Sequence, residues 1–123
     1  MNSVHEILQS FIRVRGVRAA LVAGLDGLVL EAAHSNDGPP VETDAIGAVA
    51  ASGLVPANEF GEQTGHGAVR QAIFEYEDGV VVIEMIGENA VLVVVTSISA
   101  NLGLLRLQAR KAHPDLAASL AGL

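Results

Sequence analysis

The segment GAVRQAIFEYEDGVVVIEMIGENAVLVVV, from Gly67 to Val95, contains three β-strand patterns joined by two short turns. The second and third patterns, VVVIEMI (80–86) and AVLVVVT (90–96), are almost continuously apolar, which predicts central strands covered on both faces. The sequences Glu77-Asp78-Gly79 and Gly87-Glu88-Asn89 supply the turns. The three strands are therefore predicted to form an antiparallel meander.

The first strand of this meander, Ala68–Tyr76, differs from the other two because its side chains alternate. Alternation places one set of residues on each face of a strand. One set is Val69, Gln71, Ile73 and Glu75, and the other is Arg70, Ala72, Phe74 and Tyr76. In the second strand a single charged residue, Glu84, interrupts the apolar run. We expect this carboxylate to point to an edge of the sheet or to solvent.

A β-hairpin is predicted closer to the start of the chain. The apolar runs Val17–Ala23 and Leu28–Ala33 flank Asp26-Gly27. Asp-Gly between apolar runs is a strong hairpin signal, because Asp tolerates a positive φ and Gly adopts it without a Cβ clash. The hairpin carries no chemical motif and is interpreted as scaffold, with these residues buried: Leu21, Val22 and Val29.

The first predicted helix extends from Ser3 to about Arg15. Ser3 and Glu6 have the spacing of a capping box, in which each side chain bonds the backbone of the other. Apolar residues then recur at helical spacing, and Gly16 is a typical stop.

A second helix is predicted to begin at a cap on Thr43 or Asp44. Pro56 is expected to kink or split it, because proline lacks an N–H and clashes with the preceding turn. The sequence GEQTGHG (61–67) is interpreted as a glycine-rich loop that lacks the ending of a phosphate-binding loop.

The third predicted helix covers ANLGLLRLQARKAH (100–113), with Ser97 or Ser99 as its cap. Pro114 is predicted to end this helix or to start a short one. One apolar stripe faces the core, whereas the basic residues lie away from it. The stripe is Leu102, Leu105, Ala109 and Ala112; the basic residues are Arg106, Arg110 and Lys111.

These elements predict one α/β (α+β) domain over residues 1–123, in the order α-β-β-α-β-β-β-α, with a short C-terminal tail from about residue 114. The economical layering is a five-stranded antiparallel sheet with helices on both faces. The strand over 90–96 is expected beside the strand over 17–23. The strands 28–33 and 68–76 are then the edges. An edge strand exposes unpaired N–H and C=O groups, which are either a liability or a docking site.

Composition excludes several classes of function. The formal charge is −7 and cysteine is absent, so phosphate backbones and anionic membranes are repelled and disulfides are excluded. No apolar run reaches the length of a membrane helix, and the first residues do not have the pattern of a signal peptide. We therefore expect a cytoplasmic protein without nucleic-acid partners or membrane insertion.

Catalytic patterns are also missing from the sequence. No nucleophile lies in a recognisable pair with a base, and the acidic residues fall mostly at turns and helix starts. His34, Asn36 and Asp37 lie together, but a metal requires three or four convergent ligands and nothing nearby completes the set. We expect no enzymatic activity, no cofactor and no metal.

The segments GVRAALVAGLDGLVLEAA (Gly16–Ala33), Gly67–Val95 and NLGLL (Asn101–Leu105) resemble the Roadblock (dynein light-chain roadblock-type) domain family, with its profilin-like architecture. The resemblance covers nearly the whole chain. It implies a homodimer or heterodimer in which the second helix and the third strand pair across a two-fold axis. It also implies binding to Ras-like small GTPases. Bacterial members resemble the partner of the gliding-motility GTPase, and some stimulate GTP hydrolysis. Pro56 departs from the pattern.

The second helix supports such an interface, since no charged residue occurs from Ala45 to Asn58. A helix in water on one side normally shows a charged stripe. We therefore expect a two-fold contact, broken by Ala48→Glu or Ser52→Arg and unaffected by Gln108→Glu on the third helix. The predicted interface residues are Ala45, Ala48, Val49, Ala51, Ser52 and Val55 with Val69, Gln71, Ile73 and Glu75.

Three classes of function are compatible with the chain to different degrees. The favoured one is a non-enzymatic dimeric adaptor or regulator of a Ras-like small GTPase. The alternative is a small-molecule sensor or binding module of PAS- or GAF-like type, which needs a cavity with convergent polar groups, and the third is an enzyme. Four arginines, Arg13, Arg15, Arg18 and Arg70, lie outside the third helix, none in a glycine-rich loop directed outward. We expect any stimulation of hydrolysis to act through the GTPase's own switch segments.

Overall fold

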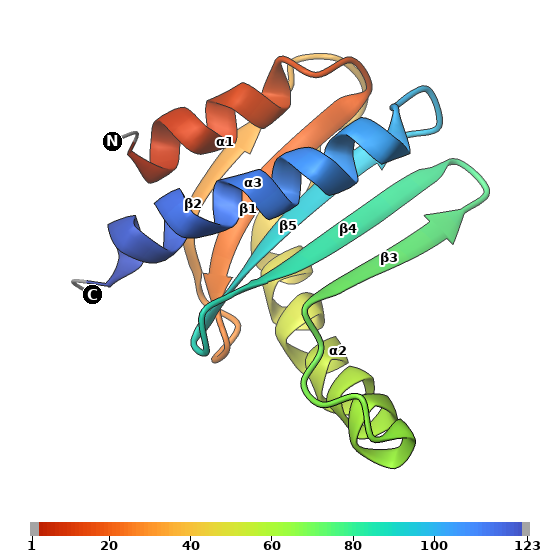
Figure 1. Cartoon of the computed structure of the whole chain (residues 1–123). Helices are drawn as coiled ribbons and strands as arrows, with labels where there is room; N and C mark the ends of the chain where they lie inside the picture. Colours follow the sequence, from red (N-terminus) through yellow and green to blue (C-terminus); the bar gives the residue numbers. More distant parts are fainter. Residues whose placement is uncertain (1–2, 122–123) are drawn as a thin grey trace.

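The structure is a computed structural model and describes residues 3–121. Three helices and five strands follow one another in the predicted order (Figure 1). The elements are α1 (Val4–Ile12), β1 (Val17–Gly24), β2 (Val29–His34), α2 (Thr43–Thr64), β3 (Gln71–Tyr76), β4 (Gly79–Ile86), β5 (Ala90–Ser97) and α3 (Leu102–Leu120).

The strands form one antiparallel sheet in the order β2-β1-β5-β4-β3. This order confirms that β5 lies beside β1 and that β2 and β3 are the two edges. Val93 of β5 pairs with Leu21 on one side and with Ile83 on the other. The central position of β5 explains why its sequence is apolar on both faces.

The core lies on both faces of the sheet. One cluster is covered by α1 and α3 and includes Phe11 and Leu105, and a second is covered by α2 and includes Leu54 and Val93. In Figure 1, α1 and α3 lie on one face and α2 crosses the other. The predicted stripe of α3 belongs to the first cluster, and its three basic residues are exposed.

The hairpin between β1 and β2 forms at the predicted Asp-Gly turn. Gly27 has a φ of 88°, and the Asp26 carboxylate accepts a hydrogen bond from the Leu28 amide at 3.0 Å. Leu21 and Val22 are fully buried, as expected, whereas Val29 is half-buried.

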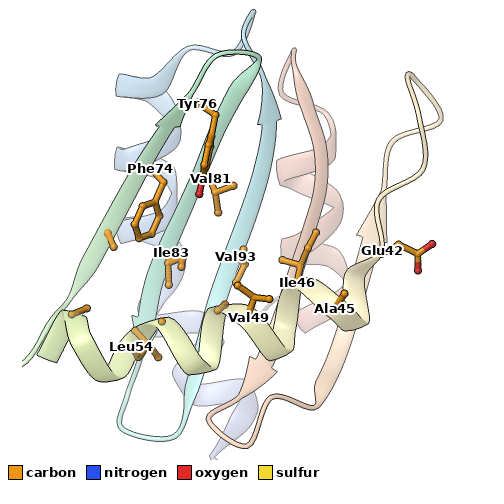
Figure 2. A pocket seen from close by; sticks show the side chains of 14 residues that line it. Glu42, Ala45, Ile46, Val49, Leu54, Phe74, Tyr76, Val81, Ile83 and Val93 are labelled. Carbon is orange, nitrogen blue, oxygen red and sulfur yellow. The ribbon is translucent and has the colours of Figure 1, made fainter.

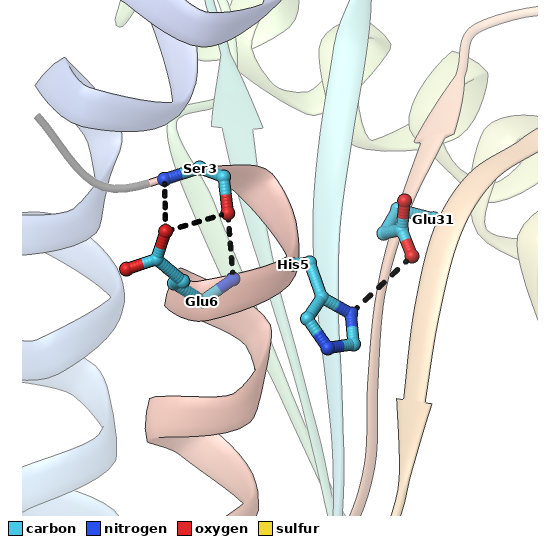
Figure 3. Close-up of polar contacts among 4 residues, drawn as sticks. All are labelled: Ser3, His5, Glu6 and Glu31. Atoms are coloured by element: carbon cyan, nitrogen blue, oxygen red, sulfur yellow. Dashed lines mark hydrogen bonds and ion pairs between the residues drawn. The ribbon is translucent and has the colours of Figure 1, made fainter.

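Helix α1 has the predicted capping box (Figure 3). The Glu6 amide donates to the Ser3 hydroxyl at 3.1 Å, and the Glu6 carboxylate accepts from the Ser3 amide at 3.4 Å. The helix ends at Ile12, so the prediction to residue 15 was too long. The cap predictions for the other two helices were wrong. Asn101 caps α3 by accepting from the Leu104 amide, and Glu42 precedes α2 with no side-chain cap bond.

Neither proline splits or ends its helix, so the predicted end at Pro114 and the split considered at Pro56 do not occur. Helix α2 continues through Pro56 to Thr64, and α3 continues through Pro114 to Leu120. Both prolines are exposed, as are Ser52 and Arg110 four residues earlier. The carbonyl groups that lose their helical partner therefore belong to exposed residues, where water is able to hydrogen-bond them. The segment from residue 114 is thus helical rather than a tail.

The glycine-rich loop is shorter than predicted. Residues 61–64 belong to α2, and Gly65, with a φ of 73°, is the C-cap that follows the last helical residue, Thr64. The amides of His66 and Gly67 donate to the Gly61 carbonyl, so the chain folds back sharply onto the helix. Strand β3 then begins at Gln71 rather than Ala68.

Candidate functional site

An apolar groove lies between α2 and the sheet. Its volume is about 440 Å³, and its floor is formed by β3, β4 and β5 (Figure 2). Phe74 and Tyr76 of β3 and Val49 of α2 lie on its walls, while Leu54 and Ile83 lie deeper.

The groove exists because α2 packs on the sheet over only part of its length. Ala50 and Leu54 are buried in the core. Toward its C-terminal end the helix extends away from the strands (Figure 1), and beyond Leu54 no residue of α2 is buried.

Large apolar side chains along this groove and helix are open to solvent. Val49 is 71% exposed, Phe60 is 74% exposed and Tyr76 is 62% exposed. Val55 and Phe74 are exposed as well. Apolar residues grouped in this way are typical of an interaction site.

The outer edge of β3 is an open hydrogen-bonding edge. The Met85 amide donates to the Arg70 carbonyl at 2.9 Å, and Gln71 then pairs with Glu84 along the ladder. Because bonded and non-bonded pairs alternate in an antiparallel ladder, Gln71, Ile73 and Glu75 direct their N–H and C=O groups away from β4. In the part of the chain that the structure describes, no strand lies beyond them.

The predicted interface residues lie on three different surfaces. On α2, Ala45 and Val49 line the groove, whereas Ala48, Ser52 and Val55 are exposed outside it. Ala51 is half-buried and also outside the groove. On β3, Gln71 and Ile73 contact the α3 side of the sheet, Glu75 is exposed, and Val69 precedes the strand and packs on the α2 side.

Sequence reasoning did not include Phe60, Phe74 and Tyr76 in the candidate surface. The alternation of β3 placed Phe74 and Tyr76 together on one face, and this was the signal that could have identified them. They face α2 (Figure 2), so it is this set, rather than Gln71 and Ile73, that continues the groove. Phe60 was not identified because α2 was not expected to continue as one regular helix beyond Pro56.

The prediction for Glu84 was wrong. Its side chain is buried, with the residue 4% exposed, and lies on the α3 side of β4. One oxygen accepts a hydrogen bond from Gln71 Nε2 at 2.7 Å, and the other lies 3.5 Å from His113 Nδ1. These partners, one from β3 and one from the part of α3 next to Pro114, make the buried position acceptable for a carboxylate.

A trough of about 540 Å³ follows the N-terminal half of β3 on the side opposite to β4. Its lining includes Gln71 and Ile73 of β3, Phe60 of α2, and the exposed Arg106 and Arg110 of α3. Within residues 3–121, neither arginine takes part in an ion pair.

The prediction for Gln108 of α3 requires correction. Gln108 is not on an outer face, because it is half-buried and its Nε2 lies 3.5 Å from the Ser10 hydroxyl. Arg70 is exposed and follows the loop that contains Gly65 and Gly67, so it adjoins the glycine-rich segment without lying within it.

Among residues 3–121, no group of three or more His, Asp or Glu side chains could hold a metal ion. His34 and Asp37 are exposed. No helix in the described part of the chain is long and apolar enough to cross a membrane.

The fold is that of a small α/β domain with one antiparallel sheet and three helices. Solved structures of the gliding protein MglB have the same fold. The protein from Thermus thermophilus is 24% identical with a TM-score of 0.88, over 96% of this chain and 88% of that one. MglB with a tetrameric arrangement is 25% identical with a TM-score of 0.89, over 95% of this chain and 87% of that one.

Relatives are also found by sequence. An uncharacterized protein of Methanocaldococcus jannaschii is 29% identical over 117 residues, which is 95% of this chain and 96% of the relative. The Roadblock/LC7 domain model matches residues 3–96. The chain therefore belongs to the Roadblock/LC7 domain family.

Proposed function

We propose that this protein is a non-enzymatic adaptor or regulator that binds a Ras-like small GTPase and works as a homodimer through α2 and β3. The observation that carries the proposal is the apolar groove beside an open strand edge. A strand edge and exposed apolar side chains on one side of a small domain together suit a protein partner.

The choice of partners rests on the family. The resemblance to Roadblock domains implies Ras-like small GTPases as ligands and pairing of two domains through the second helix and third strand. One of the similar structures is MglB with a tetrameric arrangement, which supports self-association as a property of proteins with this fold. We assign the protein to the cytoplasm, where such GTPases act.

The absence of charged residues from Ala45 to Asn58 of α2 is the physical argument that protein partners cover this helix. Both the groove side of α2, with Val49, and the exposed outer side, with Ser52, lack charges from Ala45 to Asn58. Because a solvated helix face normally carries charges, covering of both sides by protein partners, the second copy among them, accounts for their absence.

The proposal is tested first by molecular size and then by binding. Sedimentation velocity at micromolar concentration should show a dimer. Isothermal titration with a purified Ras-like GTPase from the same cell should show binding that depends on whether GDP or a non-hydrolysable GTP analogue is loaded. A monomer that binds neither loaded form would contradict the proposal.

A small-molecule binding module of PAS- or GAF-like type is the second candidate, and the size of the groove favours it. A volume of about 440 Å³ falls within the usual range for ligand pockets. Such pockets also need a few convergent polar groups, but of the lining residues only Glu42 and Tyr76 carry polar side chains, and Glu42 points away from the groove (Figure 2). Saturable binding of an apolar fluorescent probe to the dimer would favour this candidate. In the proposed homodimer the second copy fills the groove, so the probe should find no site there.

A further inference from the structure

Given the β3–β3 contact of the proposed homodimer, we propose that the two strands align in one register, with Ile73 at the two-fold axis and Glu75 of each copy beside Arg106 of the other. This inference rests on the proposed homodimer and goes further, because it names the residues that fix the alignment. It starts from the backbone of the free edge.

The backbone restricts the possible registers. Gln71, Ile73 and Glu75 direct their N–H and C=O groups outward, as the bond from the Met85 amide to the Arg70 carbonyl requires. A two-fold axis makes the pairing antiparallel and self-complementary. Only an axis through Ile73 gives all three outward residues a bonded partner, because Gln71 then faces Glu75 of the partner subunit.

Side chains on the α3 face agree with this register. Residues directly opposite each other have Cβ atoms about 5 Å apart, so the partner's Glu75 lies beside Gln71. The Gln71 side chain lies 3.4 Å from the Arg106 carbonyl, and both residues line the trough along β3. The carboxylate of the partner's Glu75 is thus brought to the guanidinium of Arg106.

In the single chain, the side chains proposed to form the ion pair are exposed and are not already paired with another charge. Glu75 and Arg106 are both exposed, and neither forms an ion pair within residues 3–121. The two-fold axis creates the contact twice. A register shifted by two residues would move the partner's Glu75 away from the trough and leave one outward residue of each strand without a bonded partner.

Exchange of the charges tests the pairing. Glu75→Arg and Arg106→Glu should each weaken the homodimer about tenfold, because each creates two like-charge contacts in place of two attractive ones. An equimolar mixture of the two variants should form a heterodimer of nearly unmodified affinity, since both of its contacts are then attractive. Native mass spectrometry measures the ratio of the three dimers.

The matched controls carry the same charge changes elsewhere. Lys111→Glu on α3 and Glu88→Arg in the β4–β5 turn are exposed and outside the trough, so their mixture should show no preference for the heterodimer. A mixture of Glu75→Arg and Arg106→Glu without such a preference would overturn the proposed ion pair.

Single cysteines test the register, because the unmodified chain has no cysteine. Opposite residues of a bonded pair have Cα atoms about 5.5 Å apart, within the range of a disulfide. Ile73→Cys should therefore cross-link the dimer under mild oxidation, whereas Ala72→Cys and Phe74→Cys should not.

The outcomes separate this inference from the proposed function. A dimer in which Phe74→Cys or Ala72→Cys cross-links faster than Ile73→Cys preserves the homodimer and overturns the register. A monomeric unmodified chain overturns the homodimer itself and this inference with it.

Discussion

Glu84 Oε2 lies 3.5 Å from Nδ1 of His113, and this contact joins the buried face of β4 to the second half of α3. The other carboxylate oxygen accepts from Gln71 of β3. One buried side chain therefore connects three elements at the border of the open edge.

We expect Glu84→Ala to lower the free energy of unfolding by about 2 kcal/mol, because it leaves the Gln71 amide without its acceptor in a partly buried position. Glu84→Gln should cost less, since its amide oxygen can still accept from Gln71. Urea unfolding followed by circular dichroism measures both. Equal stability of Glu84→Ala and the unmodified chain would contradict this role.

Val49→Glu should dissociate the proposed dimer. Val49 is 71% exposed in the single chain, so the variant should fold, but in the dimer it would bury an unpaired charge. Such a charge costs several kcal/mol, and the dissociation constant should rise at least about a hundredfold. Sedimentation equilibrium gives the constant, with Lys111→Glu as the control. A dimer that withstands Val49→Glu excludes the groove from the interface.

Ser52→Arg and Ala48→Glu test the other side of α2. Both residues are exposed outside the groove, and we expect either change to break the dimer as well, because the absence of charges extends around the helix. The same sedimentation measurement applies. If both variants remain dimeric while Val49→Glu dissociates, the outer side of α2 does not belong to the dimer contact.

Arg70→Ala should leave any stimulation of GTP hydrolysis largely intact, although Arg70 is exposed beside the glycine-containing loop. We expect stimulation to act by rearranging the switch segments of the GTPase. An inserted arginine would contribute about a thousandfold or more to the rate. Single-turnover hydrolysis with saturating protein measures this. A loss of that size with binding preserved would identify Arg70 as an inserted arginine.

Gly61→Ala should destabilise the turn that leads into β3. A Cβ at Gly61 would overlap the Gly67 carbonyl oxygen, and the Gly61 carbonyl accepts from the His66 and Gly67 amides. Gly103→Ala is the matched control, since its Cβ would meet only the Asn101 side chain within 4 Å. The control should raise stability by up to about 1 kcal/mol. A Gly61→Ala variant whose thermal unfolding midpoint equals or exceeds that of the unmodified chain would refute the clash.

Local patterns in the sequence predicted most of the fold. The Asp26-Gly27 turn, the apolar runs of β4 and β5 and the Ser3–Glu6 capping box each depend on near neighbours, and each appears as predicted. The strand order could also be predicted from the sequence, because three short turns between consecutive strands allow only a few arrangements of the sheet.

What sequence reasoning missed depends on contacts between distant residues. Pro56 and Pro114 remain inside helices at exposed positions, where water is able to replace the lost helical hydrogen bond. Whether a helix position is exposed depends on tertiary packing. Glu84 is buried because Gln71 and His113 come to it from other elements. The candidate surface was placed on α2 and β3, the elements that border the groove. The alternation of β3 already grouped Phe74 with Tyr76, but which face of β3 lies against α2 depends on how the helix packs on the sheet, which no local pattern encodes.

The unequal positions of β5 and β3 have a consequence for the rate at which backbone amides exchange with heavy water. Strand β5 is paired with β1 on one side and β4 on the other, so its amides are bonded to one or the other of these strands within the core. These amides exchange only when the whole domain opens. Outward amides such as that of Ile73 have no acceptor in a single chain and exchange freely there. In a β3-paired assembly these amides acquire acceptors, and their protection then depends on protein concentration. A few edge amides would therefore record association in the same experiment in which β5 records global stability.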